Sequence, residues 1–194
     1  MARPRSFNEQ EVLDQAVNIF WRKGFADTSI GDLEEALGMG RQSIYNTFGD
    51  KRALFVRALQ QYYERGSAFI SATFSGQRRG LDSIYSYFDA VITRQTDSDE
   101  RRGCFLVKCL VDHGTSDSEV TSRCKSNESL LVTVFKKALG EALEDQTVPG
   151  TIDVEATAMM LSTQTYGLSV MARSGASKKV LKESTYALLK QLVK

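Results

Sequence analysis

The chain of 194 residues carries 25 Lys or Arg against 24 Asp or Glu, so its net charge of +1 does not by itself indicate a nucleic-acid binder. No apolar run approaches the ~18 residues that span a membrane, and Arg3 and Arg5 stand among polar residues, unlike the start of a secretory signal. We therefore expect a cytoplasmic protein without a membrane partner. Only two prolines, Pro4 and Pro149, interrupt the chain, which favours an all-α fold of about nine helices.

Residues 8–24 carry the signals of a first helix. Asn8 can cap its N-terminus, with Glu11 at the third helical position, and Gly24 is suited to end it. This helix is expected to be the scaffold for the two short helices that follow. Trp21 is the only tryptophan, so its fluorescence is expected to report on this part of the chain alone.

Two short helical patterns come next. Ser29 and Asp32 form a capping signature for a helix that runs to Leu37, and Gly38 favours its end. A tight link then leads into a second short helix, residues 41–48. Two short helices joined by a glycine-containing turn predict a helix-turn-helix, whose second helix enters the major groove of DNA.

The second short helix is expected to bury one narrow stripe, Ile44 and Phe48, and to expose the rest. Arg pairs well with guanine and Gln with adenine, so Arg41 and Gln42 are the expected base-reading residues. The residues of this helix expected to face DNA are Arg41, Gln42, Ser43, Tyr45, Asn46 and Thr47.

The sequence around these helices follows a family pattern. The matching residues are Phe20, Gly24, Phe25, Thr28, Ser29, Ile30, Leu33, Leu37, Gly38, Ser43, Ile44, Tyr45, Phe48, Lys51, Leu54 and Phe55. In these residues roughly the first third of the chain resembles the tetracycline-repressor (TetR/AcrR) family of transcription factors. The resemblance implies a dimeric, ligand-responsive regulator, most often a repressor, that binds double-stranded operator DNA. Because its two copies are related by a twofold axis, the operator is expected to be palindromic.

The resemblance also implies DNA contacts by residues outside the base-reading pair. These are Thr28, Ser29, Tyr45 and Lys51, with phosphate anchoring expected of the last three. Thr47 departs from the family, which often has a larger aromatic residue or His at this position.

Residues 1–57 contain eight Lys or Arg and eight Asp or Glu, so their net charge does not favour DNA binding. Any electrostatic attraction to DNA must therefore come from where the basic residues lie. Arg3 and Arg5 either reach an adjacent minor groove or phosphates, or belong to a solvated tail. The cations that can lie on one side of the helix-turn-helix are Arg3, Arg5, Arg41, Lys51 and Arg52.

The rest of the chain predicts a larger helical body. We expect a helix-turn-helix DNA-binding domain at 1–50, a connecting helix at 51–75, and an effector-binding and dimerisation domain at 76–194. The body patterns cover 81–94, 104–113, 120–143 (capped by Ser116 or Asp117), 153–173 and 178–193, with a loop at 95–102. The resemblance implies that the last two helices join two copies in a four-helix bundle. Alternatively, both of their apolar stripes are internal core.

Cys104 is the candidate redox or electrophile sensor. It follows Arg-Arg-Gly at a predicted helix N-terminus, where positive charge and the helix dipole favour a reactive thiolate. Alternatively, it only begins a buried helix. Cys109 and His113 lie four residues apart, but further zinc ligands are scarce, so we predict no metal site.

An effector pocket between body helices is a further expectation. The candidate lining residues are Tyr85, Phe88, Phe105, Cys109, His113, Met159 and Tyr166. The alternative is that they are ordinary core. With one histidine, no glycine-rich phosphate loop and no acid–base pair, we expect neither an enzyme nor a cofactor. A helical protein-interaction adaptor is the competing class.

Overall fold

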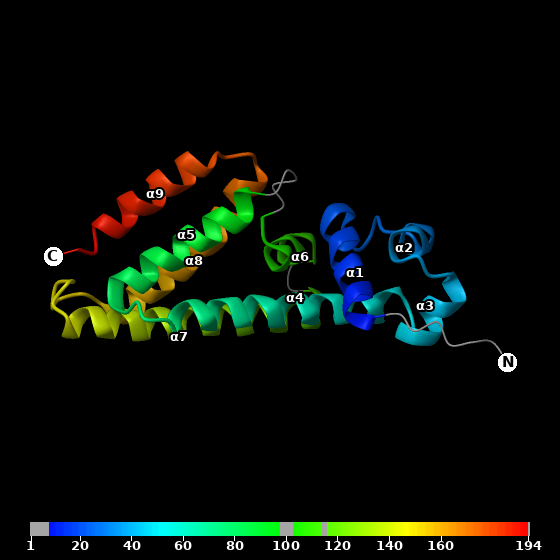
Figure 1. Ribbon diagram of the computed structural model, residues 1–194, viewed down its shortest axis with the longest axis horizontal. Coiled ribbons are helices and arrows are strands. Elements are labelled where there is room, and N and C mark those ends of the chain that lie inside the picture. Colours follow the sequence, from blue (N-terminus) through cyan, green and yellow to red (C-terminus); the bar gives the residue numbers. More distant parts are fainter. Residues whose placement is uncertain (1–7, 98–102, 114–115, 194) are drawn as a thin grey trace.

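The computed structural model describes residues 8–97, 103–113 and 116–193, and these residues form helices and connecting turns without a strand (Figure 1). The fold is therefore all-α, as predicted. The described helices are α1 (Glu9–Lys23), α2 (Ile30–Leu37), α3 (Arg41–Phe48), α4 (Lys51–Phe74), α5 (Gly80–Thr96), α6 (Phe105–His113), α7 (Ser118–Glu144), α8 (Val154–Arg173) and α9 (Lys178–Lys190).

Most helix starts have the caps that the sequence indicates. The side chains of Asn8, Asp50 and Asp117 accept hydrogen bonds from first-turn amides of α1, α4 and α7. Ser29 and Asp32 form a reciprocal capping box at the start of α2. Because each cap satisfies amides that have no partner within the helix, local sequence fixes where these helices begin.

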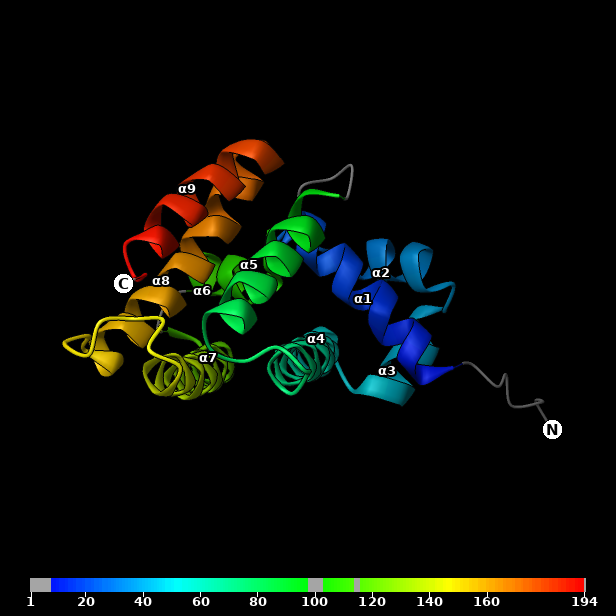
Figure 2. The same ribbon diagram turned by 60° about the vertical axis from the view of Figure 1, so that its left-hand side comes forward.

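The helices form an elongated molecule with α1–α3 at one end and α9 near the other (Figure 1). The long helices α4 and α7 run side by side along it (Figure 2). Helix α5 packs on both of them, α8 packs on α7, and α9 packs on α5 and α8. We call α1–α3 the head and α5–α9 the body, with α4 running between them.

The described residues form two hydrophobic cores, one within the body and one that spans the head and part of the body. One lies in the body, around the stacked rings of Phe88 and Phe135. The other fills the head but continues into the body through Phe105, Cys109 and Val120. The head core is therefore completed by α6 and the first turns of α7, and the two parts share packing.

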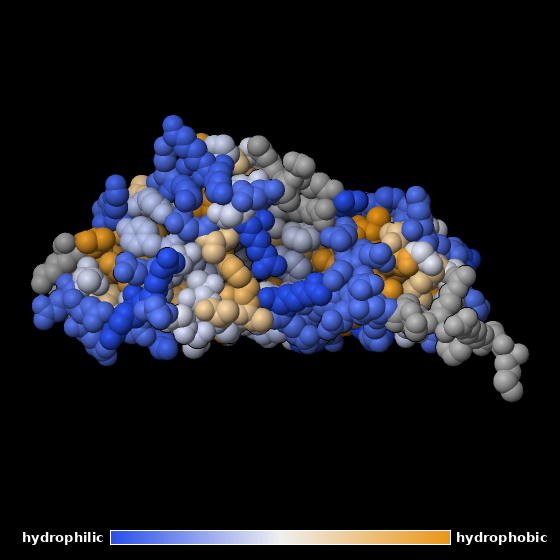
Figure 3. Space-filling view, viewed as in Figure 1, coloured by the Kyte–Doolittle hydropathy of each residue, from blue (hydrophilic) through white to orange (hydrophobic). Residues whose placement is uncertain are grey.

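The predicted loop at 95–102 was wrong at its start, because α5 continues to Thr96. Gln95 is buried and donates a hydrogen bond to Ser169 of α8, so packing extends the helix past the last apolar residue. Residues 98–102 lie outside the described part of the chain. No described helix is long and apolar enough to cross a membrane, and the face seen in Figure 3 is largely hydrophilic.

Candidate nucleic-acid interface and internal cavity

Helix α3 presents a polar face at the end of the head. Its buried residues are Ile44 and Phe48, as predicted, and Gly38 in the turn before it and Gly49 directly after it adopt positive φ angles that favour glycine. Tyr45 is 38% exposed, so its ring stands partly clear of the surface. The other side chains on this face are exposed at Arg41, Gln42, Ser43 and Asn46 and half-buried at Thr47.

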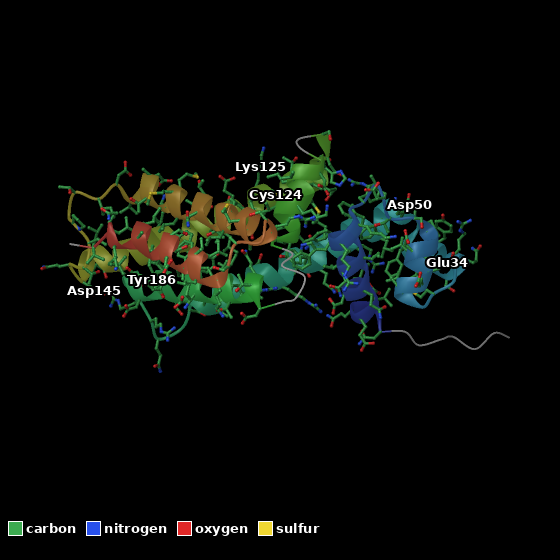
Figure 4. All side chains as sticks on the ribbon, turned by 90° about the horizontal axis from the view of Figure 1, so that it is seen from above. Glu34, Asp50, Cys124, Lys125, Asp145 and Tyr186 are labelled. Atoms are coloured by element: carbon green, nitrogen blue, oxygen red, sulfur yellow. The ribbon has the colours of Figure 1, made fainter. Side chains whose placement is uncertain are left out.

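Hydrogen bonds within this face hold several side chains in place. Gln42 donates to the Asn46 side chain at 2.9 Å, and the Thr47 hydroxyl donates to the Ser43 carbonyl. The backbone N–H of Arg41 donates to the Glu34 carboxylate at 2.7 Å. Glu34, labelled in Figure 4 at the head, therefore brings a negative charge to the N-terminus of α3.

The Arg41 guanidinium has no ion-pair partner among the described residues, unlike Lys23 of α1 and Arg57 of α4. Lys23 pairs with Asp32, and Arg57 pairs with Glu9. An unpaired, exposed guanidinium at the start of α3 is free to bind a base edge or a phosphate.

Two of the expected DNA-facing cations have partners within the protein. Lys51 donates to the Thr28 carbonyl at 2.6 Å, and its ammonium lies 4.5 Å from the Phe25 ring centre. Arg52 points to the body, where it forms a bidentate ion pair with Asp117. The expectation that Arg52 faces the DNA side was therefore wrong, since its partner caps α7. Arg3 and Arg5 lie outside the described residues.

The side chains at the start of α2 already have protein partners. Thr28 is fully buried, its hydroxyl donates to the Gly24 carbonyl and its own carbonyl accepts from Lys51, so its side chain is not available to an outside molecule. The Ser29 hydroxyl donates to the Asp32 carboxylate and accepts the Asp32 N–H. Hydrogen bonds from Lys23 and Ser29 lower the pKa of Asp32 to about 2.

A cavity of about 370 Å³ lies where the head meets the body. This volume is within the range of small-molecule sites. Its walls come from α1, α4, α5, α7, α8, and α6 with the segment that leads into it. The lining residues are Trp21, Tyr62, Gly66, Phe69, Ile70, Tyr87, Val91, Arg94, Gln95, Gly103, Cys104, Leu106, Asn127, Thr165, Tyr166 and Ser169.

Cys104 lies in this wall and is half-buried. Its carbonyl accepts the N–H of Lys108, so it stands at the start of α6 as predicted. The Tyr62 hydroxyl donates to the Cys104 sulfur at 3.6 Å and accepts the N–H of Phe105 at 3.3 Å. Burial raises the pKa of Tyr62, which keeps this hydroxyl a donor.

The other two cysteines have different surroundings. Cys109 and Cys124 are buried in the head core. Burial raises the pKa of both thiols, that of Cys124 to about 11. A thiol that stays protonated reacts slowly with electrophiles. Of the three cysteines, Cys104 is therefore the one that lines the cavity and that a reagent in the cavity can reach.

Of the seven residues expected to line a pocket, Tyr166 lines this cavity and the others do not. Tyr85 packs on Tyr186, and Phe88 is in the body core. Phe105 and Cys109 are buried in the head core, and the His113 ring lies beside Phe25 and Phe55. Met159 is exposed on α8, seven residues (about 10 Å) before Tyr166.

The lining residues of α5 show why these assignments failed. Tyr87, Val91 and Gln95 recur every four residues and share one helix face, whereas Tyr85 lies roughly opposite Tyr87. Sequence reasoning also missed Trp21, which belongs to the head and yet lines the cavity. Its fluorescence therefore reports on the cavity as well as on the head, a correction of the expectation above. No group of three or more metal-ligating side chains gathers among the described residues.

Comparisons with known proteins agree with this geometry. Residues 12–58, which cover α2 and α3, match the sequence model of the bacterial regulatory proteins of the tetR family. The chain is 29% identical to the transcriptional repressor ComR of Escherichia coli (strain K12) over 196 residues, which covers 99% of this chain and 93% of ComR. It is 26% identical to the uncharacterized regulator YezE of Bacillus subtilis (strain 168), over 89% of this chain and 90% of YezE.

A solved structure extends the likeness to the whole fold. The TetR family regulator CifR, as a cysteine-substituted variant in complex with a 26-base-pair operator DNA, superposes with a TM-score of 0.84. The two chains are 25% identical, and the match covers 97% of this chain and 98% of that one. The helix-turn-helix, the full-length fold and the relatives agree: residues 12–58 carry the DNA-binding helix-turn-helix of the tetR family, and the whole chain has the fold of a TetR family transcriptional regulator.

Proposed function

We propose that this regulator is a dimeric repressor that leaves a palindromic operator when a small-molecule or electrophilic effector occupies the cavity. One observation carries the proposal: the cavity wall joins Trp21 of the head to residues of the body. An occupant that moves this wall therefore acts directly on the head. Such a repressor acts where bacterial DNA lies, in the cytoplasm.

The aromatic contacts around the cavity supply the connection. The Trp21 ring lies 5.2 Å from the Tyr62 ring and 6.0 Å from the Phe105 ring, centre to centre. Phe105 in turn packs on Phe55 in the head core. Because packed cores change between discrete arrangements and do not deform smoothly, a shift of α6 is expected to re-orient the head.

Operator release then follows from a two-state equilibrium. In one state the two heads of the dimer lie at the spacing of the operator half-sites, and in the other they do not. An effector that binds the second state more tightly shifts the equilibrium by its difference in affinity for the two states. Arg41 and Gln42 read bases in the first state, while Tyr45 and Lys51 contact phosphates.

An electrophilic effector would bond to Cys104. The thiol gives up its proton, and the sulfur forms a bond to the electrophilic carbon. With an α,β-unsaturated carbonyl compound, the electron pair moves to the carbonyl oxygen, and the α-carbon then takes up a proton. The Tyr62 hydroxyl, which donates to the sulfur, stabilises the thiolate before the attack.

Dimerisation is proposed through α8 and α9. Large apolar side chains stand exposed on these helices, which is unusual unless another surface covers them. They are Met159, Met160, Val170 and Met171 of α8 and Val180 of α9. Sedimentation of the Met160→Glu, Met171→Glu double variant is expected to give a monomer, whereas wild type sediments as a dimer. A dimeric double variant would place the interface elsewhere.

Fluorescence anisotropy with the DNA that flanks the gene tests the proposal. Wild type is expected to bind a specific site, and Arg41→Ala to lose most of this affinity and to reduce the salt dependence. Arg79→Ala, at a surface arginine far from α3, is the control. Iodoacetamide, which alkylates the sulfur with loss of iodide, is expected to release wild type but not Cys104→Ser. No specific site, or equal release of both proteins, would contradict the proposal.

A further inference from the structure

One polar atom in the cavity wall has no partner. Gln95 is only 9% exposed, and its amide nitrogen donates to the Ser169 hydroxyl at 2.8 Å. Its carbonyl oxygen Oε1 is buried and accepts no hydrogen bond from the described residues. A buried acceptor without a donor is unfavourable, so the cavity is built to receive a hydroxyl or N–H group at this point.

The preceding residue of α5, Arg94, brings the only charge to the described lining. Arg94 is exposed, so its guanidinium stands at the mouth of the cavity, 5.2 Å from the centre of the Phe69 ring. No described carboxylate lies within ion-pair distance of it. A planar guanidinium that rests on an aromatic ring is held in position to bind a carboxylate with two hydrogen bonds.

Deeper in the cavity the wall does not favour charge. The described lining contains no Asp or Glu. Burial raises the pKa of the Tyr87 and Tyr166 hydroxyls, that of Tyr166 to about 12, so both stay neutral. The remaining wall is largely apolar. A ligand that fits must keep its negative charge at the mouth and place an uncharged body inside.

We propose that the cavity binds an amphipathic organic acid, whose carboxylate pairs with Arg94 and whose hydroxyl or N–H group donates to Gln95 Oε1. Its apolar body packs on Phe69, Val91 and Leu106. The proposal names the ligand class of the cavity and rests on the proposed function only for the consequence that binding releases DNA.

Matched eight-carbon probes test this class by quenching of the single tryptophan, Trp21, in the wall. The probes are 3-hydroxyoctanoate, octanoate, octan-1-ol and octylamine. Both acids are expected to bind at least tenfold more tightly than the alcohol and the amine. Arg94→Gln is expected to remove this preference, and Arg79→Gln, at a surface arginine outside the cavity, to retain it.

Two further variants separate the parts of the site. Gln95→Met, similar in size but without the acceptor, is expected to weaken 3-hydroxyoctanoate severalfold and to leave octanoate nearly unchanged. Gly66→Leu is expected to abolish binding of both acids with helix content retained by circular dichroism, because a side chain at Gly66 would enter open space in the wall.

The outcomes distinguish this proposal from the proposed function. Equal binding of alcohol and acid, an unchanged affinity in Arg94→Gln, or no binding of either acid would overturn the ligand class. Acid binding that leaves the operator complex intact would support the ligand class and contradict the proposed function. Release of the operator by alkylation of Cys104, together with no acid binding, would support the proposed function and contradict the ligand class.

Discussion

Arg52, the second residue of α4, forms a bidentate ion pair with Asp117, the residue that caps α7, with one of its two N–O distances at 2.9 Å. The pair joins the helix that follows the head to the helix that forms much of the body. Arg52→Gln is expected to lower the free energy of unfolding by about 1 kcal/mol, a modest loss because its side chain is 39% exposed and water screens the pair.

Asp117→Asn is the matched partner for this test, because Asn retains the cap while the charge is lost. The double variant should be no less stable than either single variant, as measured by denaturant unfolding. The hydrogen bond from Arg52 holds the pKa of Asp117 below its usual 3.8, so the pair stabilises the fold above that pH. The difference between wild type and Arg52→Gln should shrink as the pH falls below 3.8. A constant difference would contradict the assignment.

Ser29 tests a cap against a DNA contact. Ser29→Ala removes the acceptor for the Asp32 N–H, and the expected loss of stability is about 1 kcal/mol. Ser29→Thr, which can still cap, should retain most of the stability. If operator affinity falls equally in both variants, Ser29 contacts phosphate through a geometry that threonine cannot adopt. If it falls only in Ser29→Ala, the hydroxyl that serine and threonine share accounts for the effect.

Glu34 places a carboxylate at the N-terminus of α3, where the operator phosphates approach in the proposed complex. Glu34→Gln keeps an oxygen that can accept the Arg41 N–H but removes the charge. We expect severalfold tighter operator binding, measured by anisotropy at fixed salt, because the repulsion between carboxylate and phosphate is lost. Weaker binding would instead identify Glu34 as a residue that contacts a base.

Gly103 adjoins Cys104 and approaches α8 closely. Its φ is +66°, and a Cβ there would lie 2.4 Å from the Ser169 carbonyl oxygen. Gly103→Ala is therefore expected to cost at least about 2 kcal/mol, from backbone strain and from the forced displacement of α8. Gly140→Ala is the control, because it lies within α7 with open space around it and should be neutral or slightly stabilising. Equal stability of the two variants would contradict this account.

Local signals in the sequence predicted the helices well. Asn8, Ser29 and Asp117 cap the helices that their positions indicate, because capping depends on residues two or three positions apart. The helix-turn-helix follows from the same kind of short-range evidence. The buried face of α3 could also be predicted from the sequence, since Ile44 and Phe48 lie one helical turn apart.

The cavity could not be predicted in the same way, because it depends on how distant helices pack. Trp21 and Tyr166 are 145 positions apart in the chain, and no periodicity connects them. From the sequence alone Arg52 is a candidate DNA-facing cation. Its partner Asp117 lies 65 residues later in the chain, and only the fold brings the two together. Tertiary contacts therefore decide which polar residues of the head stay available for DNA.

The central claim is that filling the cavity releases the operator, and Gly66 allows a direct test without any ligand. A Cβ at Gly66 meets no atom within 4 Å, so Gly66→Leu places an apolar side chain in the cavity from within α4. Gly66→Ala, too small to fill it, is the control. Operator titrations of folded, dimeric proteins are expected to show at least tenfold weaker binding for Gly66→Leu and near wild-type binding for Gly66→Ala. Wild-type operator affinity in Gly66→Leu would contradict the claim.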